Sequence, residues 1–363
     1  EEDHVHQIGY SERGDVPVEE ISSAVKTLTY TKKRQDLTSL SMFTIDGSAT
    51  FDFDDALSLE AADDGSCRVG IHISDVAAWL APGGALDKAA LARGSSIYMA
   101  DQKIPMLPPA LSEGRCSLRA GEPRPAISTL ITFSPTADIL DCEIVPSVVC
   151  VDCHLTYNDV DRDLNYPDQP GQPPHVLQLA QSGQLQQLHA LAGMLREKRI
   201  QAGALIIAIP ELDVRIDAGG QVTLAMVDRY SRARSTVEEM MIAANGAVAR
   251  FLVAQDVPAL YRSQAEPKQR LVKKEDAPGT LFQNWVQRKM LPRVRVDRKP
   301  ERHAGLGMDA YATATSPIRK YLDLIAQRQI RAALGLGRPY TADELDALIQ
   351  RLAPVLTHVG RVQ

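Results

Sequence analysis

The most constraining feature of the chain is an acidic segment, residues 44–55, that carries four aspartates within ten positions: Asp46, Asp52, Asp54 and Asp55. Apolar, strand-like residues flank it on both sides. Carboxylates this close repel one another and raise one another's pKa. Two arrangements relieve the repulsion: the side chains spread into water, or they surround a divalent cation. The segment taken by itself leaves both interpretations open.

The surrounding residues narrow the choice of cation. Several apolar side chains should pack the segment against a core: Ile45, Phe51, Phe53, Ala56 and Leu57. An EF-hand needs glycine at its sixth position, and counting from Asp52 that position is Leu57, so a calcium loop of this type is excluded. Oxygen ligands without histidine favour Mg²⁺ or Mn²⁺ over Zn²⁺. Two such ions about 3.5–4 Å apart are the arrangement that cuts phosphodiesters.

Composition bounds the class of protein. The chain has 363 residues, 44% of them hydrophobic, which is enough for one large domain or two ordinary ones. A formal net charge of −6 argues against a protein that coats a nucleic-acid duplex, but not against a basic channel inside an acidic shell. There is no apolar run near 18 residues and no signal pattern at the first residues, so we expect no membrane contact. Five cysteines fit free thiols in a reducing cytoplasm, and we expect a cytoplasmic monomer whose protein partners the sequence does not indicate.

The pattern along the chain favours the α+β class. Residues 67–73 alternate as a half-buried strand does, and residues 127–150 suggest a hairpin around Ser134 and Pro135. A turn between two strands is expected at 217–220, and a long loop at 104–124. Helices are expected at 85–93, 173–201, 236–254, 317–334 and 342–358. Strands early and helices late favour a mixed sheet with surrounding helices over a doubly wound sheet.

A second chemical signal lies at residues 313–324. Ser316 suits a helix N-cap and Pro317 the first helical position, which places Arg319 in the first turn. A cation there opposes the helix dipole, so an anion bound by the N–H groups and the guanidinium explains it better. The alternative is an ordinary capped helix with an exposed arginine.

These two segments, in this order, resemble the ribonuclease II (RNB) family. In that family four aspartates follow a T-I-D start at offsets of six, eight and nine, and a T-S-P-I-R segment follows much later; both patterns are present at 44–55 and 315–319. The sequence between them is also similar to the family, in the H-I-x-D-V pattern at 72–76, the loop at 104–118, the helix at 237–245 and the approach at 303–311. The resemblance covers roughly residues 35–335.

The resemblance implies a hydrolytic 3′-to-5′ exoribonuclease with a narrow channel for single-stranded RNA that has a free 3′ end. It implies release of nucleoside 5′-monophosphates with Mg²⁺ as cofactor, or Mn²⁺ in its place, and no organic cofactor. Asp54 and Arg319 match the catalytic residues, and Asp46, Asp52, Asp54 and Asp55 match the metal ligands. The alternative is a catalytically silent RNA-binding protein of the same fold. Because all five residues are present, we favour the enzyme.

The resemblance also implies contacts to RNA. Tyr98 matches a tyrosine that stacks under the terminal bases, and Tyr157 and Glu238 match residues that hold the last nucleotide. Core packing is the alternative for each tyrosine. Further RNA contacts are expected at Ser316, Lys320 and Ile207, the last of which stands where the family usually has phenylalanine.

The expected organisation is a short N-terminal segment, 1–34, followed by the catalytic domain, 35–363. The family's flanking OB-fold domains do not fit in 40 residues before the motifs or 30 after them, and the sequence stops at Gln363 before a late helix that the family has.

Two weaker signals remain. The string C-x-x-C-H at 150–154 is a haem attachment pattern, but we expect no haem because no export signal or axial partner accompanies it. A basic stretch at 288–302 is either a solvated surface or a wall of the RNA channel; it contains Arg288, Lys289, Arg293, Arg295, Arg298, Lys299 and Arg302.

Overall fold

The computed structural model describes residues 34–100, 102–165, 180–216, 219–272 and 279–362. The N-terminal segment expected at 1–34 therefore lies outside the described residues, except for Arg34. So do the first part of the helix expected at 173–201 and two residues of the turn expected at 217–220. Among the helices that the structure describes, none is long and apolar enough to cross a membrane.

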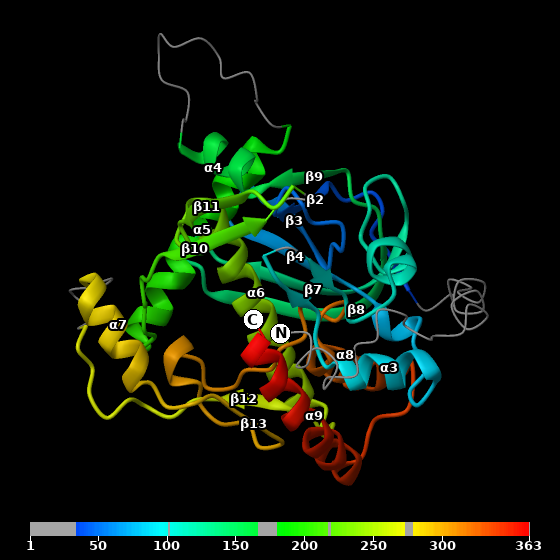
Figure 1. Ribbon diagram of the computed structural model, residues 1–363. Helices are drawn as coiled ribbons and strands as arrows, with labels where there is room; N and C mark the ends of the chain where they lie inside the picture. The colour runs from blue at the N-terminus through cyan, green and yellow to red at the C-terminus, as the bar shows by residue number, and fades with distance from the viewer. Residues whose placement is uncertain (1–33, 101, 166–179, 217–218, 273–278, 363) are drawn as a thin grey trace.

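A mixed seven-stranded sheet forms the centre of the molecule, with strand order β1-β8-β7-β4-β3-β2-β9 (Figure 1). Its strands are β1 Gln35–Asp36, β2 Met42–Asp46, β3 Asp55–Ala61, β4 Cys67–Ser74, β7 Arg124–Phe133, β8 Ile139–Val149 and β9 Cys153–Thr156. The inner strands are antiparallel, while β1 and β9 run parallel to β8 and β2. The alternating strand at 67–73 and the hairpin around Ser134 and Pro135 are confirmed.

Helices and small hairpins surround this sheet. The helices are α3 Ala85–Arg93, α4 Tyr157–Asn165, α5 Ser182–Gln201, α6 Arg232–Ala254, α7 Leu281–Met290, α8 Tyr321–Ala333 and α9 Ala342–Val362, with short turns η1 Val76–Ala78, η2 Ala110–Arg115 and η4 Ala304–Leu306. The hairpins are β5 Ile97–Tyr98 with β6 Lys103–Ile104, β10 Glu211–Ile216 with β11 Val222–Val227, and β12 Tyr261–Ser263 with β13 Arg295–Asp297. The α+β class is confirmed. The loop expected at 104–124 contains one π-helical turn, η2.

Alternation along the strands places apolar side chains on both faces of the sheet. Phe43 and Leu57 belong to the apolar cluster that β2, β3, β4 and β7 form with α4, α5 and α6. Their neighbours Met42 and Ala56 belong to a separate cluster with Phe53 and loop residues. Since each large buried side chain contributes about 1.5–3 kcal/mol, both faces hold β2 and β3 in place. These two strands carry Asp46 and Asp55 at the ends that the acidic loop joins.

The helix expected from residue 317 begins later than predicted. Ser316 is not its N-cap: α8 begins at Tyr321, and Lys320 precedes it in an extended conformation. Residues 316–320 instead form a single separate turn, in which the Lys320 N–H donates to the Ser316 carbonyl at 2.9 Å. The carbonyl of Arg319 is bonded outside the turn, because it accepts from the Ser96 N–H at 2.9 Å. The prediction was wrong because this long-range hydrogen bond outweighs the local capping preference.

A buried polar network fixes α8 against α3. Asp87 on α3 accepts from Arg328 and from the Tyr321 hydroxyl, each at 2.7 Å. Arg328 also donates to the Tyr340 hydroxyl at 2.8 Å. The side chains of Asp87 and Arg328 are 6% and 5% exposed, so removal of either charge leaves its partner unpaired in the interior. The turn at 316–320 is therefore held from the α8 side by this network.

We expect Asp87→Ala to lower the free energy of unfolding by about 3–5 kcal/mol, the range for breaking a buried ion pair. Urea denaturation monitored by circular dichroism measures it. Glu143→Gln, which removes an exposed ion pair with Arg68, serves as the control and should change little. A similar small effect for both variants would show that the network does not anchor α8.

Candidate active site

The acidic loop is rigidly attached to the chain around it. Asp46 ends β2, Asp55 begins β3, and the loop between them carries Asp52 and Asp54. The Phe53 N–H donates to the Ser117 hydroxyl at 3.1 Å, and its carbonyl accepts from the Leu118 N–H at 3.0 Å. The Asp54 carbonyl accepts from the Ser74 N–H at 2.9 Å. A loop bonded in this way cannot spread its carboxylates freely into water.

Four of the five apolar residues expected to pin the loop do so: Ile45, Phe53, Ala56 and Leu57 are buried. The expectation for Phe51 was wrong, because its side chain is 56% exposed. Its carbonyl is the anchored group and accepts from the Ser117 hydroxyl at 2.8 Å. The main chain is fixed there while the ring points outward.

The four aspartates share one cavity of about 580 Å³. A second cavity of about 650 Å³ adjoins it. The residues that line both are Asp46, Asp55, Tyr157 and Arg319. These four side chains therefore mark the junction of one connected space, with Asp52 and Asp54 on the side of the smaller cavity.

Arg319 reaches this junction from the far end of the sequence. Its Nε donates to Asp54 Oδ2 at 3.1 Å, and the N–H of the preceding residue, Ile318, donates to Asp54 Oδ1 at 2.8 Å. The Ser95 hydroxyl, like the Ser96 N–H, donates to the Arg319 carbonyl. Asp54 is thus buried and fixed by two hydrogen bonds, while 38% of the Arg319 side chain stays exposed.

Burial and mutual repulsion disfavour the charged aspartates. Burial raises the pKa of Asp54 to about 7, even though Arg319 and the Ile318 N–H act in the opposite direction. The pKa values of Asp46 and Asp55 are also raised, first by burial; repulsion by Asp54 adds to this for Asp46, and repulsion by Asp46 for Asp55. Charged carboxylates in such a place need a positive partner beyond Arg319.

We tested the donor set for a divalent cation. Within the described residues, no three His, Cys, Asp or Glu side chains converge as a ready-made metal site. The chemistry of the set nevertheless fits Mg²⁺ or Mn²⁺, because four carboxylates line one cavity and repel one another there. Without a cation between them, the carboxylates repel one another, and this repulsion keeps the four side chains from converging.

The tyrosines expected to contact RNA line these cavities. Tyr98 is 45% exposed and its hydroxyl donates to Asp52 at 3.4 Å. Tyr157 is half-buried at the start of α4, with the Arg234 guanidinium 4.2 Å from its ring centre. Burial, with the charges of Asp55 and Asp46, raises the pKa of the Tyr157 hydroxyl to about 12. Neither ring belongs to the fully buried core.

The remaining predicted residues line the larger cavity: Glu238, Ile207, Ser316 and Lys320. Burial raises the pKa of the Glu238 carboxyl and lowers that of the Lys320 ammonium. Ile207 is half-buried on the wall, so it is not a packed core residue. The structure therefore brings every predicted site residue to the same connected space.

Three neighbours of the site escaped sequence reasoning. Lys103 pairs with Asp52 at 2.7 Å, and its ammonium lies 5.8 Å from the centre of the Tyr98 ring. Tyr230 lines the larger cavity and its hydroxyl donates to the Ile207 carbonyl. The Asn245 side chain accepts from the Ala314 N–H at 2.8 Å and positions the segment before Arg319. Lys103 and Tyr230 lie in polar stretches that match no motif. An aromatic residue within such a stretch is the sequence signal that could have indicated Tyr230.

The C-x-x-C-H string lies at a strand end, as expected. Its His154 is on β9, where Nδ1 is 2.9 Å from the Thr44 hydroxyl and Nε2 accepts from the Ala120 N–H at 3.1 Å. Its ring stacks on Phe53 at 3.8 Å. His154 therefore packs against the acidic loop through Phe53.

A family model of the RNB domain matches residues 34–335. The chain belongs to the RNB family. A protein of Synechocystis sp. named an uncharacterized ribonuclease is 34% identical over 328 residues, which cover 89% of this chain and 47% of that protein. The ribonuclease R of Thermotoga maritima is 30% identical, covering 96% of this chain and 54% of its own length. The chain thus spans about half the length of the curated relatives it matches.

Solved structures show the same fold. Mycoplasma genitalium RNase R in complex with ribose-methylated single-stranded RNA matches 96% of this chain and 59% of its own, with a TM-score of 0.78 and 22% identity. At this identity the likeness concerns the RNB fold, and it agrees with the mixed sheet and helices described above.

The raised carboxyl pKa values predict how Mg²⁺ changes stability with pH. The Asp54 pKa rises from 3.8 to about 7 on folding, so between these values the folded metal-free chain holds more protons than the unfolded one. Its stability should therefore fall as pH rises through this window. Mg²⁺ binds the deprotonated carboxylates, so it should raise the melting temperature more at about pH 8 than at about pH 5. Differential scanning fluorimetry measures this; equal shifts at both pH values would contradict it.

Proposed function

We propose that this chain is a metal-dependent hydrolytic exoribonuclease that shortens single-stranded RNA from its 3′ end and releases nucleoside 5′-monophosphates. One observation carries the proposal: the four aspartates and Arg319, from opposite ends of the sequence, line a single connected cavity. Membership of the RNB family and the ribonuclease names of its relatives support it.

Each carboxylate has a proposed role. Asp46, Asp52 and Asp55 hold Mg²⁺, with Mn²⁺ as a substitute. Asp54 holds a second ion and orients the attacking water. Bound divalent ions supply Lewis acidity at the scissile phosphate and lower the pKa of water. No organic cofactor is needed for this chemistry.

Arg319 binds the scissile phosphate in this scheme. An arginine carries five N–H donors. Within the described part of the chain, the Arg319 side chain donates through Nε to Asp54, which leaves the other donors for phosphate oxygens. Because the Ser95 hydroxyl and the Ser96 N–H fix its backbone carbonyl and Asp54 holds its Nε, the guanidinium is oriented before the substrate arrives. A fork of donors held in place favours the charge of the transition state.

The terminal nucleotides occupy the cavity beside these groups. The exposed Tyr98 ring offers a stacking face that accepts any base, which suits an enzyme without sequence preference. Tyr157 and Glu238 hold the last nucleotide, with Ile207, Ser316 and Lys320 along the path of the strand. We further propose that residues 35–363 form one catalytic domain that works as a monomer in the cytoplasm.

A silent RNA-binding protein is the second candidate. The structure of yeast Ssd1, described as a pseudonuclease, matches 96% of this chain and 50% of its own, with a TM-score of 0.71 and 17% identity, so the fold alone does not decide activity. The complete set of four aspartates and the Asp54–Arg319 contact favour the enzyme.

The decisive experiment incubates the protein with 5′-labelled single-stranded RNA bearing a 3′ hydroxyl, with Mg²⁺ or with EDTA, and identifies the products. We expect nucleoside 5′-monophosphates and progressive shortening from the 3′ end with Mg²⁺ only. Asp54→Asn should lower turnover by about 10²–10³-fold, typical of one charge-stabilising group, while RNA binding is kept. Internal cuts, full activity in EDTA, or an Asp54→Asn variant with more than about a tenth of the turnover would refute the proposal.

A further inference from the structure

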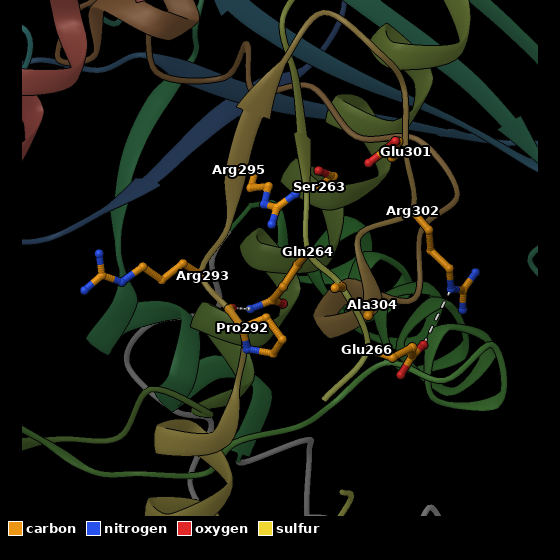
Figure 2. Close-up of a pocket in the computed structure, with 10 residues that line it drawn as sticks. Ser263, Gln264, Glu266, Pro292, Arg293, Arg295, Glu301, Arg302 and Ala304 are labelled. Carbon is orange, nitrogen blue, oxygen red and sulfur yellow. Dashed lines mark hydrogen bonds and ion pairs between the residues drawn. The ribbon is translucent and has the colours of Figure 1, made fainter. Parts of the chain in front are cut away.

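A third cavity, of about 420 Å³, lies behind the wall of the larger active-site cavity. Figure 2 shows the residues that surround it, which come from β12 and the chain after it, from the approach to β13 and its first residue, and from residues 301–304. Gln264 lines both this cavity and the active-site cavity.

The wall between the two spaces is one chain thick. Successive residues of an extended strand point to opposite sides, and here Arg262 faces the active-site cavity while Ser263 faces the third one. In the same way, His303 lines the active-site cavity and Ala304 lines the third one. A Cβ on Gly305 would lie 2.4 Å from the Gln264 side-chain oxygen, so the Gln264 side chain packs closely against the Gly305 backbone. The two cavities are therefore immediate neighbours.

The basic stretch at 288–302 is sorted by its contacts into two groups. Some of its members are paired with carboxylates: Arg298 with Asp346 at 2.7 Å, Lys299 with Glu301 at 3.3 Å, and Arg302 with Asp309 at 2.5 Å. Arg293 and Arg295, which line the third cavity, form no ion pair with any described residue. The same holds for Arg288, which lines the larger active-site cavity, and for Lys289, which lies over the Trp285 ring. The two exposed guanidiniums of Arg293 and Arg295 at one cavity are therefore available to an anion.

The two acids of the third cavity do not neutralise these arginines. Glu266 pairs with Arg270 at 2.6 Å, and Glu301 pairs with Lys299. Figure 2 shows the Arg295 side chain beside Ser263 and Gln264, whereas the Arg293 side chain extends away from them. Ser263 and Arg295 are direct cross-strand partners, so a hydroxyl and a guanidinium lie side by side. Phosphate oxygens are the ligands that such a pair binds.

Groups on the active-site side of the same wall also lack partners. Arg262 Nε and His303 Nδ1 are buried without a hydrogen bond to any described residue. Both side chains line the active-site cavity. Polar side chains therefore face both cavities from the two sides of this wall.

We propose that Arg295 and Ser263 bind one backbone phosphate of the RNA strand and Arg293 an adjacent one, upstream of the nucleotides held in the active-site cavity. This inference rests on the proposed function, because it assigns the 5′-ward part of the same substrate. The site then discriminates by length: an RNA long enough to reach the third cavity gains affinity that a very short RNA does not.

The test compares two RNAs in EDTA, where no hydrolysis occurs, by fluorescence anisotropy. One has about four nucleotides and the other about sixteen, within the range of lengths that single-strand sites engage. Arg293→Gln with Arg295→Gln should weaken binding of the longer RNA by about tenfold or more. For the longer RNA, the slope of log K against log salt concentration should decrease in magnitude by about 1.4, at about 0.7 for each of two phosphates. Binding of the shorter RNA should not change.

The control is Arg298→Gln with Lys299→Gln, which removes the same charge from paired side chains of the same segment. It should leave the affinity for both RNAs unchanged. Melting temperatures of both double variants verify that they fold.

Unchanged binding of the longer RNA by the Arg293/Arg295 variant would overturn the inference, as would an equal loss for both RNAs or for both double variants. A variant that resists inhibition by nucleoside 5′-monophosphate but binds the longer RNA normally would instead make the cavity a product site. Because binding is measured without catalysis, a protein that fails to release monophosphates but shows the length-dependent loss would refute only the proposed hydrolysis.

Discussion

The contact between Asp54 and Arg319 joins two segments that lie 265 residues apart in the chain. On one side stands a loop between β2 and β3, held by Ser74, Ser117 and Leu118. On the other stands a turn before α8, held by Ser95 and Ser96. Each segment is fixed by its own hydrogen bonds, so the Asp54–Arg319 ion pair joins two segments that are already held in place. The cavity between them exists because both parts are anchored.

Burial of several carboxylates at this meeting point has an energetic cost. Their raised pKa values show that the folded chain places negative charge where it is poorly solvated. One arginine offsets part of that cost, and the rest is the physical basis for cation binding. Positive charge is concentrated further out, in the arginines and the lysine that line the larger cavity and in Arg293 and Arg295 beside it. A chain with a net charge of −6 can therefore present a basic path to a polyanion.

The sequence predicted the parts of this arrangement that depend on local pattern. The acidic segment, the hairpin around Ser134 and the α+β class follow from spacing and alternation. It failed where distant residues decide: α8 begins at Tyr321 because Ser96 binds the Arg319 carbonyl and Gly94 binds the Tyr321 N–H, two backbone groups that a helix from 317 would use. Lys103 and Tyr230 reach the site through tertiary packing and carry no motif. For Arg293 and Arg295, the sequence could not tell which members of the basic stretch would find carboxylates.

The central claim is that the buried aspartates form a cation site. Crystals of the protein grown with Mn²⁺, with anomalous differences measured at the manganese absorption edge, test it directly. The account predicts anomalous density in the cavity beside β2 and β3, with carboxylate oxygens of Asp46, Asp52, Asp54 and Asp55 turned toward it. An empty cavity at saturating Mn²⁺, or a manganese bound only elsewhere on the protein, would contradict the claim.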